Sequence, residues 1–149
     1  MAKPTTMTRD EVEMILDEVF PQRNQGRAAS VVEEVGPLFA RVRLVYDERD
    51  LRPGGTISGP AMMGLADLAL YVAILANIGP VALTVTTNLS FNFLRKPGPR
   101  DLIAECRLLK LGKRLAVGEV ALRSDGEPDI VCHATGTYSI PSRLSDSRS

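Results

Sequence analysis

Histidine and cysteine, the side chains that most often bind transition metals or act as activated nucleophiles, are scarce in this chain of 149 residues. There is one histidine, His133, and there are two cysteines, Cys106 and Cys132. The cysteines form no CxxC or Cys/His cluster, so the sequence indicates neither a zinc site nor a disulfide framework. Adjacent residues of a strand point to opposite faces, so Cys132 and His133 cannot form a catalytic dyad. We therefore expect two buried thiols in a reducing compartment, a histidine on a sheet face, and no metal or redox cofactor.

An excess of charge of either sign is also absent. The 18 Lys and Arg residues balance the 18 Asp and Glu residues, so no global field would attract nucleic acid or an anionic membrane. The N-terminal segment MAKPTTMTRDEVE has no apolar core of the kind found in signal peptides. The length fits one ordinary domain, and the chain contains no internal repeat. These features predict a cytoplasmic, single-domain protein, residues 1–149, that acts on a small molecule.

One long apolar run is present, over residues 59–83, and a single carboxylate, Asp67, lies inside it. The run is long enough to cross a bilayer. However, a central Asp costs about 2.5–3.5 kcal/mol on insertion scales, and Pro80 would interrupt the span. A helix that is apolar on every side is normally enclosed by the rest of a soluble fold. We therefore predict a buried central helix over residues 59–78, with Ser58 as its N-cap, and no membrane.

The remaining segments show the patterns of one short helix and six strands. Thr8 and Glu11 form a capping box at the start of an amphipathic helix over residues 8–20. Two segments flank Gly36-Pro37 and predict a hairpin, and a polar loop, DERDLRPGGT, follows them. The six predicted strands cover residues 28–34, 38–46, 84–94, 102–111, 115–122 and 130–140. The polar tail, residues 142–149, is predicted to be loose.

The order of these elements predicts the fold class. It reads helix, two strands, long helix, four strands, and the strands are mostly joined by hairpins. Such strands form a largely antiparallel sheet, and a sheet wide enough to curl can enclose one apolar helix. We predict an α+β fold in which a curled, mostly antiparallel sheet wraps around the helix at residues 59–78, with an extra N-terminal helix.

The segment SGPAMMGLADLA, residues 58–69, resembles the central motif of the hotdog-fold thioesterases, in particular the PaaI-like acyl-CoA thioesterase group. That motif begins with His-Gly-Gly at the helix start and continues to a Leu-x-Asp. The segments TVTTNLSFNFLRKPGPRDLIAECRLLKLGKRLAVGEVAL and CHATGTYSI also resemble the later strands of the family in order and spacing. Three departures are visible: Ser58 replaces the His, Pro60 replaces the second Gly, and Arg52 occupies a place where some members have Asn.

The resemblance implies hydrolysis of an acyl-CoA thioester, with CoA as part of the substrate and no separate cofactor. This reaction needs a group that polarises the carbonyl oxygen and a carboxylate that activates water or attacks directly. The unpaired amide of Gly59 at the helix N-terminus is the natural polariser, with Ala61 as a second candidate, whereas Pro60 has no N–H. Asp67 is then the base or nucleophile. The resemblance favours Thr86 as the hydroxyl that positions the water or the carboxylate, although strand propensity explains this threonine equally well.

Gly59 and Asp67 are eight residues apart, which is about 12 Å along a helix, too far for both to flank one carbonyl. Two antiparallel copies of the helix, related by a two-fold axis near Met63, would place Gly59 of one subunit opposite Asp67 of the other. Gly64 and Ala66 would allow the helices to approach closely. The resemblance implies the same homodimer, or a dimer of dimers. The alternative is that Asp67 is a structural carboxylate satisfied by neighbouring groups.

Ser58 is a further candidate catalytic residue, because a serine hydroxyl can act as a nucleophile, although the N-cap role explains it better. The surrounding GTISG is not a G-x-S-x-G motif, and no histidine is near it in the sequence.

Basic side chains are suited to the phosphates of CoA, and apolar side chains to the acyl group, although solvated turns and core packing explain each residue separately. The candidate substrate-binding residues are Arg52, Pro60, Met63, Arg95, Lys96, Lys113 and Arg114.

Two functions other than hydrolysis are possible for this fold. The scarcity of histidine argues against the hydratase branch of the hotdog fold, which uses an Asp/His pair. The main alternative is a non-catalytic protein that binds acyl-CoA or another small ligand and lacks the His and second Gly of the motif. The surroundings of Asp67 distinguish the two functions. A thioesterase requires Asp67 to border an open cleft beside a free Gly59 amide, whereas a non-catalytic binding protein does not.

Overall fold

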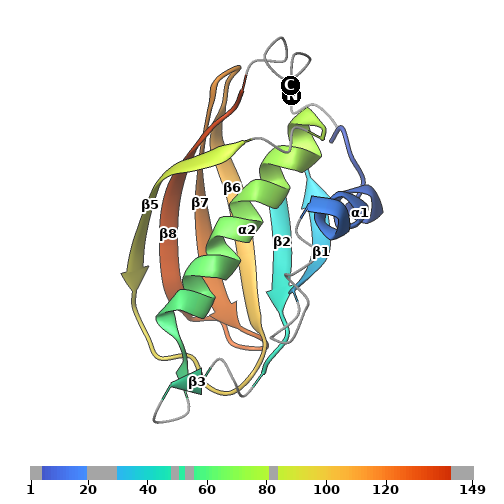
Figure 1. Cartoon of the computed structure of the whole chain (residues 1–149). Coiled ribbons are helices and arrows are strands. Elements are labelled where there is room, and N and C mark those ends of the chain that lie inside the picture. The colour runs from blue at the N-terminus through green and yellow to red at the C-terminus, as the bar shows by residue number, and fades with distance from the viewer. Residues whose placement is uncertain (1–4, 20–29, 48–50, 53–55, 81–83, 142–149) are drawn as a thin grey trace.

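A curled sheet of six antiparallel strands surrounds one long helix, α2 (Gly59–Ile78), in the computed structural model (Figure 1). The structure describes residues 5–19, 30–47, 51–52 (backbone only), 56–80 and 84–141. The sheet has the order β1-β2-β6-β7-β8-β5. Its strands are β1 (Ser30–Gly36), β2 (Phe39–Leu44), β5 (Val85–Phe93), β6 (Leu102–Leu111), β7 (Leu115–Ser124) and β8 (Ile130–Ser139). A short helix, α1 (Arg9–Val19), lies beside β1. The predicted α+β hotdog fold is confirmed.

The polar loop before α2 differs from the prediction. Its described residues include two very short strands, β3 (Leu51–Arg52) and β4 (Thr56–Ile57), which pair antiparallel. Two residues per strand are too few to produce a visible alternation of apolar and polar side chains, so the pattern could not reveal this pair. The predicted tail, residues 142–149, and the ends of two predicted elements, Phe20 and residues 28–29, lie outside the described residues.

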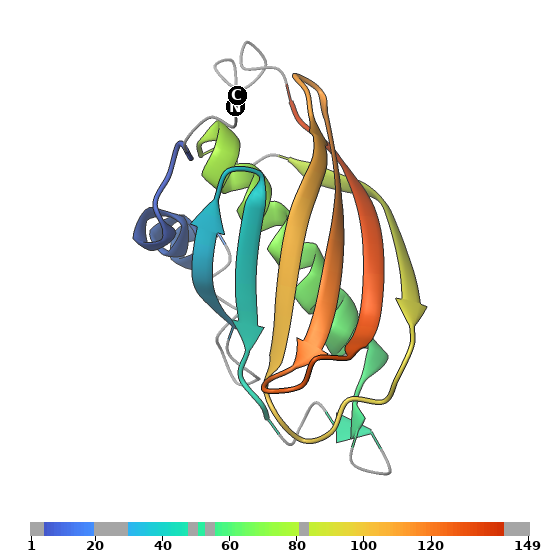
Figure 2. The same ribbon diagram turned by 180° about the vertical axis from the view of Figure 1, so that it is seen from behind.

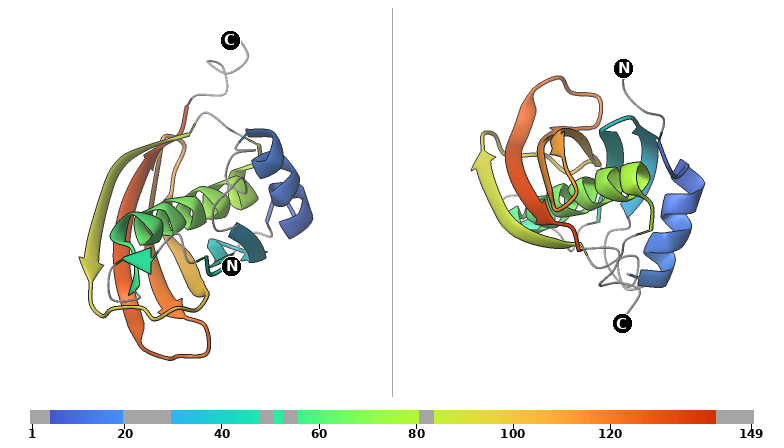
Figure 3. Two further views of the ribbon diagram at one scale, coloured as in Figure 1. Left: turned by 60° about the horizontal axis from the view of Figure 1, so that its bottom comes forward. Right: turned by 90° about the horizontal axis from the view of Figure 1, so that it is seen from above.

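The helix α2 has the length and composition of a membrane span, but it is the core helix of this fold. The sheet wraps around it (Figure 3), and 61% of the apolar window is buried inside the structure. Figure 2 shows the opposite, convex face of the sheet, behind which α2 runs. The prediction of a buried central helix is confirmed.

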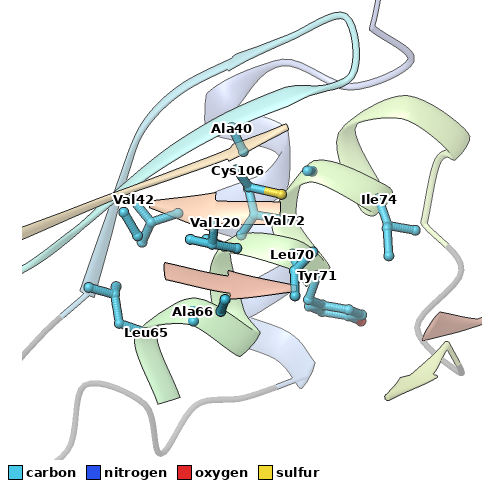
Figure 4. Packing of buried hydrophobic residues seen from close by; sticks show 14 of the residues in the cluster. Ala40, Val42, Leu65, Ala66, Leu70, Tyr71, Val72, Ile74, Cys106 and Val120 are labelled. Carbon is cyan, nitrogen blue, oxygen red and sulfur yellow. The ribbon is translucent and has the colours of Figure 1, made fainter. Parts of the chain in front are cut away.

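Two glycines allow α2 to pack closely on the sheet. Gly118 of β7 and Gly136 of β8 are register partners, and a Cβ atom on either would lie 2.7 Å from a δ-methyl of Leu70. Leu70 is fully buried in the centre of the core (Figure 4). Any larger residue at these positions would push the helix or Leu70 outward. The glycines therefore fix the position of α2, and of Asp67 one turn before Leu70, relative to β7 and β8.

The C-terminal end of α2 is anchored by side-chain and backbone hydrogen bonds. The Asn77 amide donates to the carbonyl of Gly36 at 3.3 Å, and its oxygen accepts the N–H of Leu38 at 3.0 Å. The backbone N–H of Thr6 donates to the carbonyl of Ala76 at 2.7 Å. The last of these bonds satisfies a carbonyl group of the kind that a helix end leaves without a partner. Together they hold α2 to the turn between β1 and β2 and to the segment before α1.

The two edges of the sheet differ. Helix α1 packs against β1, and the Glu13 carboxylate accepts the N–H of Val32 at 3.0 Å. The opposite edge, β5, is nine residues long and largely exposed. Val85 and Phe93 at its two ends are 56% and 51% exposed. Within the described chain, β5 pairs with β8 on one side only, so this edge is available for pairing with another chain.

We predict that Gly136→Ala lowers the free energy of unfolding by about 1–3 kcal/mol, because the added methyl overlaps the side chains of Leu70 and Leu89 in a filled core. Urea unfolding of the two proteins measures the difference. Gly98→Ala is the matched control, since no atom lies within 4 Å of its added Cβ, and its stability should stay within about 0.5 kcal/mol of the natural chain. Equal stability of Gly136→Ala and the natural chain would contradict the close packing of α2.

Candidate functional site

The Asp67 carboxylate is half-buried on α2 and is held by hydroxyl groups from two strands. Thr86 of β5 donates to Oδ1 of Asp67 at 2.8 Å. The Tyr138 hydroxyl, from β8, contacts the same Oδ1 and lies 2.8 Å from the Asp67 backbone carbonyl oxygen. Among the described residues, Oδ2 of Asp67 has no hydrogen-bond partner. One oxygen of the carboxylate is thus fixed, and the other is open to a ligand or water.

Strand register brings Thr86 to this position. Thr86 and Tyr138 are Cα partners between β5 and β8, and the register shifts immediately afterwards, between Thr86 and Asn88. Such a β-bulge changes the direction of side chains locally. Thr87, at the irregularity, donates instead to the carbonyl of Thr137 at 3.2 Å. The threonine that the resemblance favours is therefore the one that contacts Asp67.

Tyr138 was not among the predicted site residues. The only sequence signal is that Ala134, Gly136 and Tyr138 alternate along β8, so that Tyr138 faces the core, where a tyrosine hydroxyl needs a partner. The sequence does not give the register that makes Asp67 this partner. Burial, together with the hydrogen bond to Asp67, raises the pKa of Tyr138. The phenol therefore stays protonated at ordinary pH and acts as a hydrogen-bond donor.

In the first turn of α2, one amide has no acceptor among the residues that the structure describes. Ser58 is the N-cap, and its Oγ accepts the N–H of Ala61 at 3.2 Å. The carbonyl of Ser58 accepts the N–H of Met62, also at 3.2 Å, and Pro60 has no N–H. Among the described residues, nothing accepts the N–H of Gly59. The expectation that Ala61 could also polarise a substrate is wrong, because its amide is already bound to the cap.

An aromatic surface lies beside this free amide. A Cβ atom added to Gly59 would be 3.8 Å from Cζ of Phe93. The Phe93 ring stacks with that of Phe91, with ring centroids 6.0 Å apart and planes inclined by 16°. Because Phe93 is half exposed, the pair forms an apolar wall that a ligand near the Gly59 amide would contact.

Gly59, Met63 and Asp67 follow one another at intervals of four residues and so lie along one stripe of α2. Met63 is 41% exposed, and no atom lies within 4 Å of a Cβ added to Gly64. Ala66, in contrast, is fully buried in the core cluster shown in Figure 4. The expectation that Ala66, together with Gly64, allows a second helix to approach closely does not fit its position, because the side chain of Ala66 is buried in the core and offers no open surface.

The basic residues predicted to bind the phosphates of CoA are divided between the two ends of the sheet. One pair follows the end of β5, and the other is in the turn between β6 and β7, at the opposite end, since neighbouring strands are antiparallel. The pairs are Arg95 with Lys96, and Lys113 with Arg114, and all four residues are exposed. Within one chain these four residues therefore form two separate groups. The backbone of Arg52 is in β3, and its side chain lies outside the described residues.

A shallow cavity of about 340 Å³ lies on the convex face of the sheet. Paired polar and charged side chains occupy its lining: His133 Nε2 is within hydrogen-bond distance of Glu119 at 3.2 Å, and Arg123 forms an ion pair with Glu105 at 2.8 Å. Cys132, next to His133, is fully buried on the other face. The expected position of His133 on a sheet face is confirmed, and the sheet separates this cavity from Asp67.

The two thiols are buried and free. Burial raises the pKa of Cys106 to about 12 and also raises the pKa of Cys132. A thiol acts as a nucleophile only when it is deprotonated, so neither cysteine is suited to covalent catalysis. In the part of the chain that the structure describes, no three His, Cys, Asp or Glu side chains form a group that could hold a metal ion.

Comparison with known proteins agrees with this architecture. The family model described as the thioesterase superfamily matches residues 54–131. A protein from Pseudomonas aeruginosa assigned as an esterase, PA0474, is 32% identical over 124 residues, which cover 77% of this chain and 91% of that protein.

Solved structures show the same relationship. A protein from Silicibacter sp. TM1040 assigned as a thioesterase, TM1040_1390, is 46% identical with a TM-score of 0.83, covering 92% of this chain and 94% of that one. A mutant of the phenylacetic acid degradation protein PaaI from Thermus thermophilus shares the fold, with a TM-score of 0.70, 24% identity, and coverage of 81% and 99%. The chain therefore belongs to the thioesterase superfamily and has its hotdog fold.

Proposed function

We propose that the protein hydrolyses an acyl-CoA thioester to a free acid and CoA, at sites that form between two copies of the chain. The observation that carries this proposal is the presence, on one stripe of α2, of a carboxylate with a free Oδ2 and a helix N-terminus with a free amide. Asp67 supplies the carboxylate and Gly59 the amide. These are the two groups that thioester hydrolysis requires.

A second copy of the chain supplies the missing half of each site. Gly59 and Asp67 of one chain are about 12 Å apart along α2, so they cannot act on the same carbonyl. The exposed β5 edge allows an antiparallel β5–β5 contact that continues the sheet. Such a contact places two α2 helices antiparallel, with the axis near Met63 and open space at Gly64. Gly59 of each subunit then faces Asp67 of the other.

The chemistry follows from these positions. The Gly59 amide and the positive end of the α2 dipole stabilise the negative charge that develops on the carbonyl oxygen. In one route, Oδ2 of Asp67 removes a proton from water as the water attacks the carbonyl carbon. In the other route, Oδ2 itself attacks the carbonyl carbon and forms an anhydride, which water then hydrolyses. In both routes the C–S bond breaks, and CoA leaves as a thiolate and takes up a proton. Thr86 holds Oδ1 throughout.

The same two-fold arrangement accounts for the divided basic residues. Within one chain, the β6–β7 turn lies at the end of the sheet where β5 begins. In an antiparallel β5–β5 contact, the start of β5 in one subunit lies beside the end of β5 in the other, so the β6–β7 turn of one subunit lies near the end of β5 of its partner. Arg95 and Lys96 then share a rim with Lys113 and Arg114 of the partner subunit. This rim would bind the phosphates of CoA, while Pro60 and Met63 border the acyl group.

The alternative, a non-catalytic acyl-CoA binding protein, draws support from the two departures at the helix start. Pro60 removes one donor that a second glycine would offer, and Ser58 replaces a histidine. The open Oδ2 of Asp67 favours hydrolysis, because an ionised carboxylate oxygen only accepts hydrogen bonds and so contributes nothing to the binding of a thioester carbonyl.

We predict that Asp67→Asn lowers kcat by about 100-fold or more, because the amide keeps the shape of the side chain but cannot accept a proton or attack. Thiol release from short, medium, long and aromatic acyl-CoAs measures the effect. Asp129→Asn, at an exposed turn position, is the matched control and should keep full activity. If the natural chain binds acyl-CoA without releasing thiol, the ligand-binding alternative is correct.

Ser58→Ala should lower the free energy of unfolding by about 0.5–2 kcal/mol, through loss of the N-cap, and should leave kcat within a few-fold of the natural value. Thermal or urea unfolding and the same thiol assay measure the two effects. A folded Ser58→Ala protein as inactive as Asp67→Asn would instead identify Ser58 as a catalytic group.

A further inference from the structure

We propose that Tyr138 is a positioning residue, whose phenol fixes Oδ1 of Asp67 so that Oδ2 is the oxygen that takes part in the reaction. The inference rests on the proposed function and extends it to a residue outside the family motif in α2. Tyr138 is 3% exposed, so it acts through Asp67 and does not contact the substrate.

The phenol contacts Asp67 at two atoms. Its oxygen lies within hydrogen-bond distance of both the carboxylate Oδ1 and the backbone carbonyl oxygen of the same residue. A phenol has one proton, so it donates to one acceptor at a time, and an ionised carboxylate is the stronger acceptor. The second contact places the phenol against the backbone of α2. Tyr138 therefore fixes the carboxylate relative to the helix that also provides the Gly59 amide.

Thr86 and Tyr138 approach the same oxygen from neighbouring strands. Both lie at Oδ1, and they are register partners in β5 and β8. Rotation of the carboxylate would break both contacts at once, so the pair keeps Oδ2 in a constant direction. Holding a reacting group in place contributes to rate by reducing the entropy lost on reaching the transition state. Without Tyr138, the threonine alone would hold a carboxylate that can turn.

Tyr138 itself is held firmly. It is in β8, which pairs with β7 on one side and β5 on the other. It also lies two residues after Gly136, against which the side chain of Leu70 packs. Its pKa is raised by burial and by Asp67, so it remains a donor over the whole pH range in which the enzyme would be assayed. A phenylalanine would fill the same space in the core without this hydrogen bond.

Tyr138→Phe tests the inference. The expected result is a fall in kcat of about 10- to 100-fold, the range for loss of a hydrogen bond to a charged group, with KM changed by less than about 3-fold. The loss should fall on kcat and not on KM, because Tyr138 orients the reacting carboxylate and does not contact the substrate. Tyr46→Phe is the control, since β6 and β7 separate the strand before Tyr46 from β8, and it should behave as the natural chain.

A second variant keeps both the ring and the hydroxyl. Incorporation of 3-fluorotyrosine at position 138 retains the hydrogen-bond donor, so kcat should stay within a few-fold of the natural value, in contrast to Tyr138→Phe. If Tyr138→Phe keeps the natural kcat, or if the two variants lower kcat equally, the hydrogen bond is not what matters; Tyr138 is then only a packing residue and the inference is wrong. If the natural chain itself releases no thiol from acyl-CoA, the proposed function fails, and the inference fails with it.

Discussion

The structure depends on the need to satisfy one carboxylate on an otherwise uncharged core helix. Asp67 is the single charged side chain on α2, and an unpaired charge in such a place would cost several kcal/mol or be neutralised. The fold meets this requirement with hydroxyls from β5 and β8, which reach only Oδ1. The carboxylate is thus stable enough to be kept and still has one oxygen free. Oδ1 of Asp67 receives the contacts that stabilise the carboxylate, and Oδ2 is the oxygen that the proposed reaction uses.

The close packing of α2 on the sheet links the core to the site. Gly118 and Gly136 admit Leu70, and this contact sets the distance between α2 and the strands that carry Thr86 and Tyr138. At the N-terminus of the same helix, Ser58 binds two amides and leaves that of Gly59 free. In the proposed function, this helix supplies both the carboxylate and the amide of the site but holds them about 12 Å apart, too far to act together within one chain. The long, exposed β5 edge offers the contact by which a second copy would unite them.

Much of the fold could be predicted because its signals are local. Ser58 and the Gly79-Pro80 pair mark the ends of α2, which runs over the predicted residues 59–78, and β6 covers its predicted range, 102–111. Contacts that depend on strand register or on sheet ends could not be predicted. The partnership of Tyr138 with Asp67 needs the β5–β8 register, and sequence proximity concealed that the basic turns lie at opposite ends of the sheet. The burial of Ala66 could not be predicted from its place beside Asp67 either, because adjacent residues of a helix point about 100° apart.

The central claim is that Gly59 and Asp67 act together only across two subunits, and subunit mixing tests it most directly. Gly59→Pro removes the free N–H at a helix position that tolerates proline, and the extended backbone of Ser58 (φ −68°, ψ 153°) suits a residue before proline. Mixing inactive Gly59→Pro with inactive Asp67→Asn, after unfolding and refolding together, should restore about one quarter of the natural rate, since half of the dimers are mixed and each has one intact site. No recovery in mixtures shown to contain mixed dimers would mean that the two residues do not share a site across the interface.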